Sequence, residues 1–406
     1  MLAPSQPELQ DRIVALRGGI GSVPGVRVSG VHAGIKRRKR DLALIAFDRE
    51  QACAAVVTTN DVKAAPITVS SEHIASGMGV RALVCNSGCA NACTGERGDR
   101  DARATAAQAA ALLEIAPQQV IVASTGVIGV PLPLDRVQRG LERCVEQLDE
   151  GLKAAHDAAE AIMTTDRVPK LSAYAFYHDA KRYTIGGIAK GSGMIAPNMA
   201  TMLAFLATDF PAAQGDLQRS LAAAVDGTFN MISVDGDMST NDAVYLCAPQ
   251  GSQPLPAIFE QVVGKVALDL ALAMVDDGEG ATKRLEVRIV GARDSGQARA
   301  VARAIVNSSL VKTALYGEDP NWGRIIAAAG AARIGLETDR WSLALNDRCW
   351  VERGAIETLS EAEAHRELEE REIVVTLDLG LGDAIATAWG CDLSRDYVRI
   401  NASYRT

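Results

Sequence analysis

Histidine is scarce in this 406-residue chain, and the five histidines lie far apart, at positions 32, 73, 156, 178 and 365. None of them accompanies a serine flanked by glycines, so the sequence shows no sign of a Ser-His-Asp hydrolase. The lack of such an arrangement favours a nucleophile whose base is not a histidine. The free α-amine of an N-terminal threonine is one such base, since it can activate the hydroxyl of its own residue.

Positive charge is also in short supply. The formal net charge is −8 and the pI is near 5.3, which disfavours a general nucleic-acid-binding protein. The one dense basic run is Lys-Arg-Arg-Lys-Arg at 36–40. Such a run can be an anion-binding patch or a localisation signal, but a solvated turn between two strands is the favoured interpretation.

The eight cysteines are scattered and do not form a disulfide framework. Cys85, Cys89 and Cys93 are spaced by four and would share one face if they lay on a helix, but no histidine lies near enough in sequence to complete a metal site. We expect reduced structural thiols and no metal. The first eight residues have neither a charged start nor an apolar core, so we expect no signal peptide and a cytoplasmic location, with mitochondrial import left open.

The usual nucleotide and calcium motifs are missing. Lys190 precedes Gly191 and Ser192, whereas a Walker A loop places its lysine after the glycine. The stretch 278–283 lacks the third glycine of a dinucleotide-binding loop. The acidic stretch 235–242 lacks the spacing of a calcium loop, and a turn rich in side-chain-to-backbone hydrogen bonds is favoured there. We therefore expect no cofactor.

The most distinctive stretch present is Lys190-Gly-Ser-Gly-Met-Ile-Ala-Pro-Asn-Met-Ala-Thr-Met-Leu-Ala-Phe205. It opens a run of 18 residues without charge that ends before Asp209. The glycines and the Pro-Asn pair argue against a membrane helix, so a buried strand or turn is predicted. At the Ala200–Thr201 junction a hydroxyl can attack the preceding carbonyl, and cleavage would give Thr201 a free α-amine. A buried core threonine is the alternative.

The hydrophobic pattern predicts a layered α/β fold with mixed sheets flanked by helices. Strands are expected at 26–29, 42–47, 54–59, 81–86, 119–124, 171–177, 182–188, 285–290, 341–345, 373–378 and 384–389. Helices are expected at 101–113, 216–225, 256–275, 297–305 and 324–332. One long helical pattern follows Pro133 and reaches Ile162, and the alternating run 397–400 is expected to be a final strand.

Several blocks resemble the ornithine acetyltransferase family, the glutamate N-acetyltransferases of arginine biosynthesis. The stretch 190–203 is similar to the autoproteolysis motif of that family. The other similar blocks, spread over nearly the whole chain, are 86–95, 124–129, 163–166, 234–242, 317–323 and 401–406. The resemblance implies an N-terminal-nucleophile-like autoproteolytic fold. It also implies an α chain of residues 1–200 and a β chain of residues 201–406, assembled as an α2β2 heterotetramer.

The resemblance also implies roles for individual residues. Thr201 would be the nucleophile, cut from Ala200, while Thr125 and Gly126 would form the oxyanion hole through a hydroxyl and a backbone N–H. The substrate-binding positions implied by the family are Thr164, Lys190, Thr201, Glu279, Asn401 and Thr406. Lys190 and Glu279 would give a zwitterionic amino acid one cationic and one anionic contact.

The implied reaction moves an acetyl group from N-acetylornithine to glutamate through an acetyl-Thr201 enzyme, in ping-pong order. Whether acetyl-CoA is a second donor stays open at this point. The alternatives are an autoproteolytic aminopeptidase or amidase of similar fold and a non-catalytic amino-acid-binding relative. Two departures from the family pattern, Cys89 and Arg167, leave the acceptor preference open.

Overall fold

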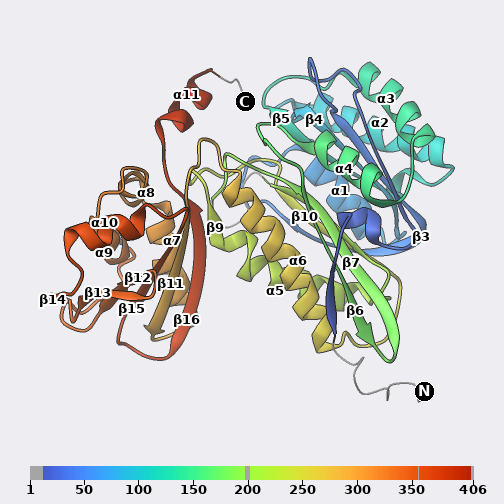
Figure 1. The fold of residues 1–406 in the computed structure, drawn as a ribbon. Helices are drawn as coiled ribbons and strands as arrows, with labels where there is room; N and C mark the ends of the chain where they lie inside the picture. The colour runs from blue at the N-terminus through green and yellow to red at the C-terminus, as the bar shows by residue number, and fades with distance from the viewer. Residues whose placement is uncertain (1–11, 197–201, 355, 404–406) are drawn as a thin grey trace, which may run out of the picture.

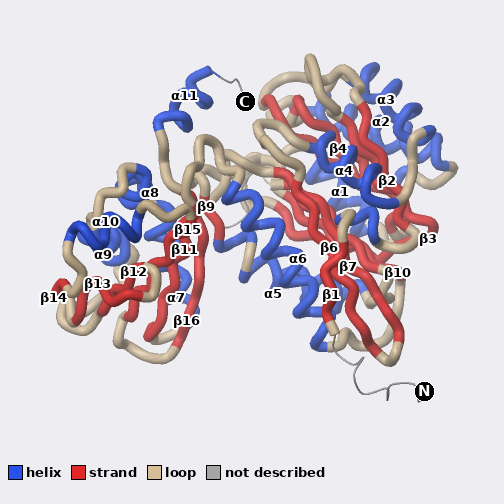
Figure 2. Tube along the Cα trace, in the orientation of Figure 1, coloured by secondary structure: helices blue, strands red, loops and turns tan. Residues whose placement is uncertain are grey.

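The computed structural model describes residues 12–196, 202–354 and 356–403, which form two lobes (Figures 1 and 2). The first lobe is built on a nine-stranded sheet in the order β1-β6-β7-β8-β10-β3-β4-β5, with β2 beside β3. Its strands are β1 (Ile13–Leu16), β2 (Val26–Val31), β3 (Leu42–Val57), β4 (Val80–Cys89), β5 (Val120–Val127), β6 (Lys170–His178), β7 (Lys181–Lys190), β8 (Leu203–Thr208) and β10 (Ala243–Pro249). Its helices are α1 (Ala65–Ala75), α2 (Gly95–Leu113), α3 (Leu134–Glu146), α4 (Gly151–Ile162), α5 (Gln214–Gly227) and α6 (Ala257–Asp276).

The second lobe carries a seven-stranded sheet in the order β14-β13-β12-β15-β11-β16-β9. Its strands are β9 (Ile232–Ser233), β11 (Arg284–Ala292), β12 (Ser342–Leu345), β13 (Arg348–Glu352), β14 (Ile356–Glu357), β15 (Glu372–Asp378) and β16 (Ala384–Cys391). Its helices are α7 (Ser295–Asn307), α8 (Ser309–Tyr316), α9 (Trp322–Ala331), α10 (Glu361–Leu368) and α11 (Arg395–Ser403). Both sheets mix parallel and antiparallel pairs, so the predicted layered α/β fold with mixed sheets is confirmed.

The centre of the first sheet is covered by helices on both faces. Along β8, Ala204 and Leu206 belong to the core that contains α5 and α6, whereas Leu203 and Phe205 belong to the core that contains α4. The sequence of a strand buried on both faces is apolar at successive positions and does not alternate between apolar and polar residues. The uncharged stretch therefore enters a central strand, and among the described helices none combines the length and apolar character needed to cross a membrane.

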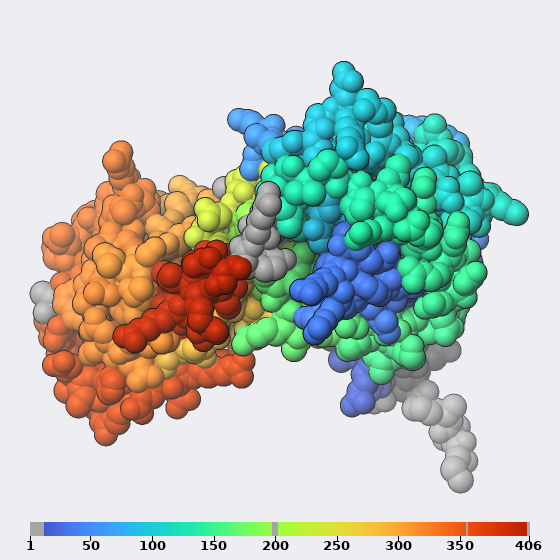
Figure 3. Space-filling model, turned by 90° about the horizontal axis from the view of Figure 1, so that it is seen from above, coloured from blue at the N-terminus to red at the C-terminus, as the bar shows by residue number. Residues whose placement is uncertain are grey.

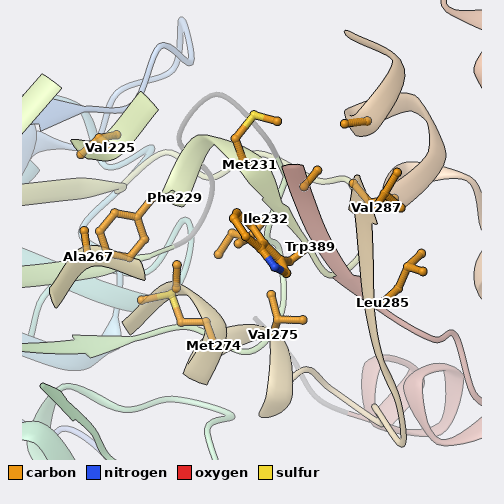
Figure 4. Packing of buried hydrophobic residues seen from close by; sticks show 14 of the residues in the cluster. Val225, Phe229, Met231, Ile232, Ala267, Met274, Val275, Leu285, Val287 and Trp389 are labelled. Carbon is orange, nitrogen blue, oxygen red and sulfur yellow. The ribbon is translucent and has the colours of Figure 1, made fainter. Parts of the chain in front are cut away.

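One hydrophobic core continues from the first lobe into the second. Figure 4 shows Trp389 of β16 beside Ile232 of β9, with Met274 and Val275 of α6 close by. Trp389 and Ile232 are also paired in register between the two strands. Since β9 belongs to the second sheet but follows α5 of the first lobe, this pairing joins the two lobes.

Three predictions about single elements are wrong. The strands expected at 42–47 and 54–59 are one strand, β3, because the charged residues 48–50 lie exposed at a register shift while the backbone stays paired. The helix expected from Pro133 to Ile162 is two helices, α3 and α4. The chain leaves the helix to form a bridge between Asp149 and Val28, and Gly151 has a φ of 86°.

The strand expected at 397–400 is part of a helix, α11. Local hydrogen bonds favour the helix: the N–H of Asp396 donates to Ser394 Oγ, and Arg399 pairs with Asp396 three residues earlier at 2.9 Å. α11 buries none of its residues. It stands at the opening between the lobes, at the top of Figure 1, and is the red segment in Figure 3.

Candidate active site

A polar cavity lies where the two lobes meet, at the ends of β5 and β7. The first lobe contributes Ala90, Thr125, Gly126, Ile128, Thr164, Thr165, Lys190, Gly193 and Met194, and the remaining lining residues are Asp235, Asp237, Ser239, Asn241, Glu279, Tyr397 and Asn401. The structure therefore brings together Thr125, Gly126, Thr164, Lys190, Glu279 and Asn401, all predicted from the sequence. Ala200, Thr201 and Thr406 lie outside the described residues.

Thr125 and Gly126 occupy the cavity end of β5. Gly126 has a φ of 127°, and a Cβ atom there would lie 2.5 Å from the carbonyl carbon of Gly88 on β4. Only glycine fits this conformation and this close approach. The Nδ2 group of Asn241 fixes the same edge, donating to the carbonyl oxygens of Ser124 (2.8 Å) and Ala90 (2.7 Å). The strand end that carries the Thr125 hydroxyl is thus held from two sides.

Lys190, the last residue of β7, is buried and points at Thr125. Its Nζ lies 3.4 Å from Thr125 Oγ1. Burial lowers the pKa of the Lys190 ammonium from its ordinary value, and the nearby Asp166 carboxylate opposes this effect. A cation and a hydroxyl donor therefore face the same small volume, an arrangement that stabilises negative charge on a bound oxygen.

The Asp166 carboxylate supplies negative charge near this cation. Burial alone would raise the pKa of Asp166, but the ammonium groups of Lys190 and Lys170 outweigh burial and lower it to about 2. Asp166 Oδ1 accepts from Lys170 Nζ and from the N–H of Gly191, both at 2.7 Å. Asp166 is therefore ionised at neutral pH and ties the cavity to the start of the stretch that follows β7.

That stretch is anchored on both sides of residues 197–201. Before them, the N–H groups of Met194 and Ile195 donate to Asp235 at 2.6 and 2.8 Å. After them, the N–H of Met202 donates to Asp242 Oδ1 at 2.9 Å. The predicted turn with side-chain-to-backbone hydrogen bonds at 235–242 is thus confirmed, and its carboxylates hold the chain at either end of the Ala200–Thr201 segment.

Asp242 is the most unusual of these carboxyl groups. It is fully buried, and burial raises its pKa to about 8. Its second oxygen, Oδ2, has no hydrogen-bond partner within the described part of the chain. Because Met202 N is bonded directly to the carbonyl carbon of residue 201, this carboxyl group lies one peptide unit from Thr201.

The raised pKa of Asp242 predicts a pH dependence of stability. Between about pH 4 and pH 8 the folded protein holds a proton that the unfolded chain releases, so this group lowers the free energy of unfolding as pH rises. In Asp242→Asn the amide oxygen still accepts from Met202. We expect the melting temperature of this variant to fall less between pH 5 and pH 8 than that of the wild type. Asp383→Asn, at an exposed position, is the control, and parallel curves for all three proteins would contradict the prediction.

Glu279 and two residues of α11, Tyr397 and Asn401, also line the cavity. The N–H of Glu279 donates to Ser192 O at 2.7 Å, and its Oε2 accepts from Asn401 Nδ2 at 2.7 Å. Tyr397, one turn earlier on α11, donates its hydroxyl to Asp235 Oδ2 at 3.3 Å. Tyr397 and Asn401 are spaced by four residues, so a helix places both on one side, facing the cavity.

The two departures from the family pattern lie outside the cavity lining. Cys89 is buried, donates its thiol to Val130 O at 3.3 Å, and has a pKa raised by burial. Arg167 pairs with Asp277 at 3.0 Å, and its side chain is 62% exposed. The helical face considered for Cys85, Cys89 and Cys93 does not exist, because the first two lie on β4 and Cys93 is exposed. All eight cysteines are free thiols, as predicted.

Reasoning from the sequence did not assign roles to Asp166, Asp235, Asn241, Asp242 or Tyr397. Four of these five lie in the blocks 163–166 and 234–242, where polar residues follow an apolar segment. That signal was visible, but only the three-dimensional structure shows which carboxylate faces a backbone N–H and which faces a lysine.

The fold and this cavity define an α/β enzyme whose polar site lies at the ends of its strands. The model of the ArgJ family matches residues 27–406. The arginine biosynthesis bifunctional protein ArgJ of Caldanaerobacter subterraneus subsp. tengcongensis is 46% identical, over 96% of this chain and 99% of that protein. The protein of the same name from Geobacter sulfurreducens is 48% identical, over 95% of this chain and 100% of that protein. The chain belongs to the ArgJ family.

Two solved structures of related proteins each cover about half of this chain. An ornithine acetyltransferase from Mycobacterium tuberculosis, solved in complex with ornithine, is 41% identical, covers 46% of this chain and 98% of its own, and has a TM-score of 0.43. The argJ protein of Bacillus halodurans is 42% identical, covers 47% of this chain and 99% of its own, and has a TM-score of 0.44.

Proposed function

We propose that the chain cuts itself between Ala200 and Thr201 and then transfers an acetyl group from N-acetylornithine to glutamate. Membership of the ArgJ family supports this function, as do the relatives named for arginine biosynthesis. One structural observation carries it. The hydroxyl of Thr125 and the buried ammonium of Lys190 face one cavity, and the stretch containing Thr201 is anchored beside it through Met194 and Met202.

Self-cleavage is an acyl shift followed by hydrolysis. The Thr201 hydroxyl oxygen attacks the Ala200 carbonyl carbon, and the C–N bond breaks as the ester forms. The hydroxyl proton passes to the departing nitrogen, so the α-amine of Thr201 is free once the C–N bond has broken. Water then hydrolyses the ester, which frees the carboxylate of Ala200 and the hydroxyl of Thr201. The Thr125 hydroxyl and the Gly126 N–H would stabilise the negative oxygen of both tetrahedral intermediates.

Acetyl transfer then uses the new α-amine as a base. The amine takes the Thr201 hydroxyl proton while the oxygen attacks the acetyl carbonyl carbon of N-acetylornithine. The C–N bond of that amide breaks, and the proton passes to the departing amine of ornithine. The amine of glutamate attacks the acetyl ester in the second half-reaction, giving N-acetylglutamate and free Thr201.

Charge at the two ends of the cavity suits an amino-acid substrate. Lys190 would bind the α-carboxylate, and Asp166 keeps a negative charge behind that lysine. Glu279, 8% exposed, would bind an ammonium group at the opposite side. Thr164, Asn401 and Thr406 complete the proposed set of substrate contacts.

The proposed α and β chains, 1–200 and 201–406, would stay joined after cleavage. β8 of the β chain is paired with β7 of the α chain, and β10 of the β chain is paired with β3 of the α chain. The cut would therefore release a strand end inside a sheet without separating the two chains. An α2β2 assembly in the cytoplasm is part of the same proposal.

A transfer assay separates this function from its alternatives. Incubation with N-acetylornithine should yield N-acetylglutamate only when glutamate is present. Release of acetate at the same rate with and without glutamate would identify an amidase of similar fold. A protein that binds the amino acid but turns over neither substrate would be the non-catalytic relative.

Removing one oxyanion donor should slow both reactions. We expect Thr125→Ala to lower kcat by roughly 10²–10³-fold, the usual effect of losing one such donor, and to slow self-cleavage. The rates are measured by the transfer assay and by a time course of the two chains on a denaturing gel. Thr313→Ala, on the exposed side of α8, is the matched control and should change neither rate. Near-normal turnover of Thr125→Ala would remove Thr125 from the mechanism.

A further inference from the structure

Two cysteines that the proposed reaction does not use lie opposite each other in the first sheet. Cys53 of β3 and Cys247 of β10 are register partners in an antiparallel pair, so their side chains lie on the same face of the sheet. Both belong to the hydrophobic core that contains α4. They are free thiols in the structure, so the pair is in its reduced state.

The backbone of Cys53 shows which kind of register pair this is. Its N–H donates to Gln214 Oε1 at 2.9 Å, and its carbonyl oxygen accepts from Gln214 Nε2 at 2.5 Å. Since Gln214 belongs to α5, these two groups point away from β10. Ala55, two residues later, is bonded in the same way to Gln218. Cys53 and Cys247 therefore form a non-hydrogen-bonded pair, in which the two Cα atoms of an antiparallel ladder lie only about 4.5 Å apart.

That separation suits a disulfide bond. The Cα atoms of linked cysteines lie about 4.4–6.8 Å apart, so the two sulfur atoms can bond without a large movement of either strand. Burial raises the pKa of the Cys247 thiol well above its ordinary value, and the hydrogen-bonded Cys53 thiol raises it further. The two thiol groups are thus already in contact in the reduced protein.

Cys53 also lines a second cavity, which gives small molecules access to its thiol. The pairing of β3 with β4 ends at Gln51, and the cavity lies at the edge of β3 that follows. Two of its other lining residues, Gly77 and Gln250, are exposed, so the cavity opens to solvent. Cys247, in contrast, is fully buried. A small neutral oxidant would therefore meet Cys53 first.

We propose that Cys53 and Cys247 form a reversible disulfide when the protein is exposed to hydrogen peroxide. The peroxide oxidises the Cys53 thiol to a sulfenic acid, and one molecule of water leaves. The Cys247 sulfur then bonds to the Cys53 sulfur, the S–O bond breaks, and the hydroxyl group leaves with the Cys247 proton as a second water. The peroxide takes both electrons. Two molecules of a thiol such as glutathione return them by thiol–disulfide exchange.

This disulfide would join the two proposed chains. Cys53 lies within residues 1–200 and Cys247 within residues 201–406. Cys247 is paired with Ala207, at the opposite end of β8 from Leu203, so the link would lie away from the end of β8 that follows Thr201. The disulfide forms whether or not the chain is cut, and only its role as a link between chains rests on the proposed function.

The test is a non-reducing denaturing gel of cut protein that has been treated with hydrogen peroxide and then blocked with N-ethylmaleimide. We expect the two wild-type chains to migrate together near 42.8 kDa and to separate after dithiothreitol is added. Cys53→Ala and Cys247→Ala should each give two separate chains with or without peroxide. The matched control, Cys93→Ser/Cys349→Ser, lacks both exposed thiols and should form the link as the wild type does.

Peptide mapping identifies the linked residues. Trypsin, which cuts after lysine and arginine, releases Cys53 in the peptide 50–63 and Cys247 in the peptide 220–265, and neither peptide contains another cysteine. After peroxide treatment the two peptides should be found joined, with a mass two hydrogens below their sum. Separate peptides after this treatment, or a link that persists in Cys53→Ala, would overturn the proposal.

The same experiment distinguishes this inference from the proposed function. A chain that stays uncut would run as one band under all conditions, which would reject self-cleavage. The joined peptides would still be found in that case if the disulfide forms, so the two claims succeed or fail separately.

Discussion

Thr201→Ala is expected to remain a single chain of 42.8 kDa and to lose acetyl transfer. The variant has no hydroxyl to attack the Ala200 carbonyl, so the peptide bond stays closed. It also lacks both the nucleophile and the free α-amine needed for transfer, so we expect turnover to fall by on the order of 10⁴-fold or more. Intact mass and N-terminal sequencing measure the first effect, and the transfer assay measures the second.

Thr201→Ser is the matched control, because it keeps a hydroxyl at the same position. It should still produce a second chain that begins at residue 201 and should retain measurable transfer. Circular dichroism would confirm that both variants fold, since β8 begins only at Leu203 and stays paired with β7 and β10. Active wild-type protein that remains one chain, or efficient cleavage of Thr201→Ala, would refute the proposed maturation.

Deletion of residues 401–406 is expected to separate cleavage from transfer. α11 buries none of its residues, so losing its last turn should cost little more than the hydrogen bond from Asn401 to Glu279, about 1 kcal/mol of the free energy of unfolding. The anchors of the Ala200–Thr201 segment, Asp235 and Asp242, are untouched. Cleavage should therefore proceed. Transfer should fall on the order of 10²-fold, because Asn401 and Thr406 would no longer hold the substrate.

A shorter deletion of residues 404–406 separates the contribution of Thr406 to acetyl transfer from that of Asn401. It keeps Asn401 and its hydrogen bond to Glu279 but removes Thr406. An intermediate loss of transfer would assign a contact to each residue. Full activity of the longer deletion, in protein that has been cut, would show that the C-terminal segment plays no part in binding.

Most strands could be predicted because their signal is local. β6 and β7 alternate around a polar turn, and β5 is a short apolar run, so the sequence predicts them without knowledge of any partner. The break between α3 and α4 could not be predicted in this way, because it depends on a bridge between Asp149 and Val28, 121 residues earlier in the chain. The helix at 395–403 was not predicted, because the alternating residues 397–400 indicated a strand. The hydrogen bond from Asp396 to Ser394 that favours the helix is seen only in the structure.

The candidate site was predicted in part. Thr125, Gly126, Lys190 and Glu279 were named from a family resemblance, and the structure places all four on one cavity. The protonation state of Asp242 could not be predicted from the sequence. Its pKa is raised by complete burial, which only the folded structure shows. The composition of a motif indicates which groups are present, whereas burial and neighbouring charge determine what each group can do.

The central claim is that Thr201 carries the acetyl group. Cut wild-type protein should be mixed with N-acetylornithine in the absence of glutamate, quenched in acid and analysed by peptide mass spectrometry. We predict one added acetyl group on the peptide that begins at Thr201, and its disappearance when glutamate is added before the quench. An unmodified Thr201 peptide under conditions where N-acetylglutamate is formed would contradict the account.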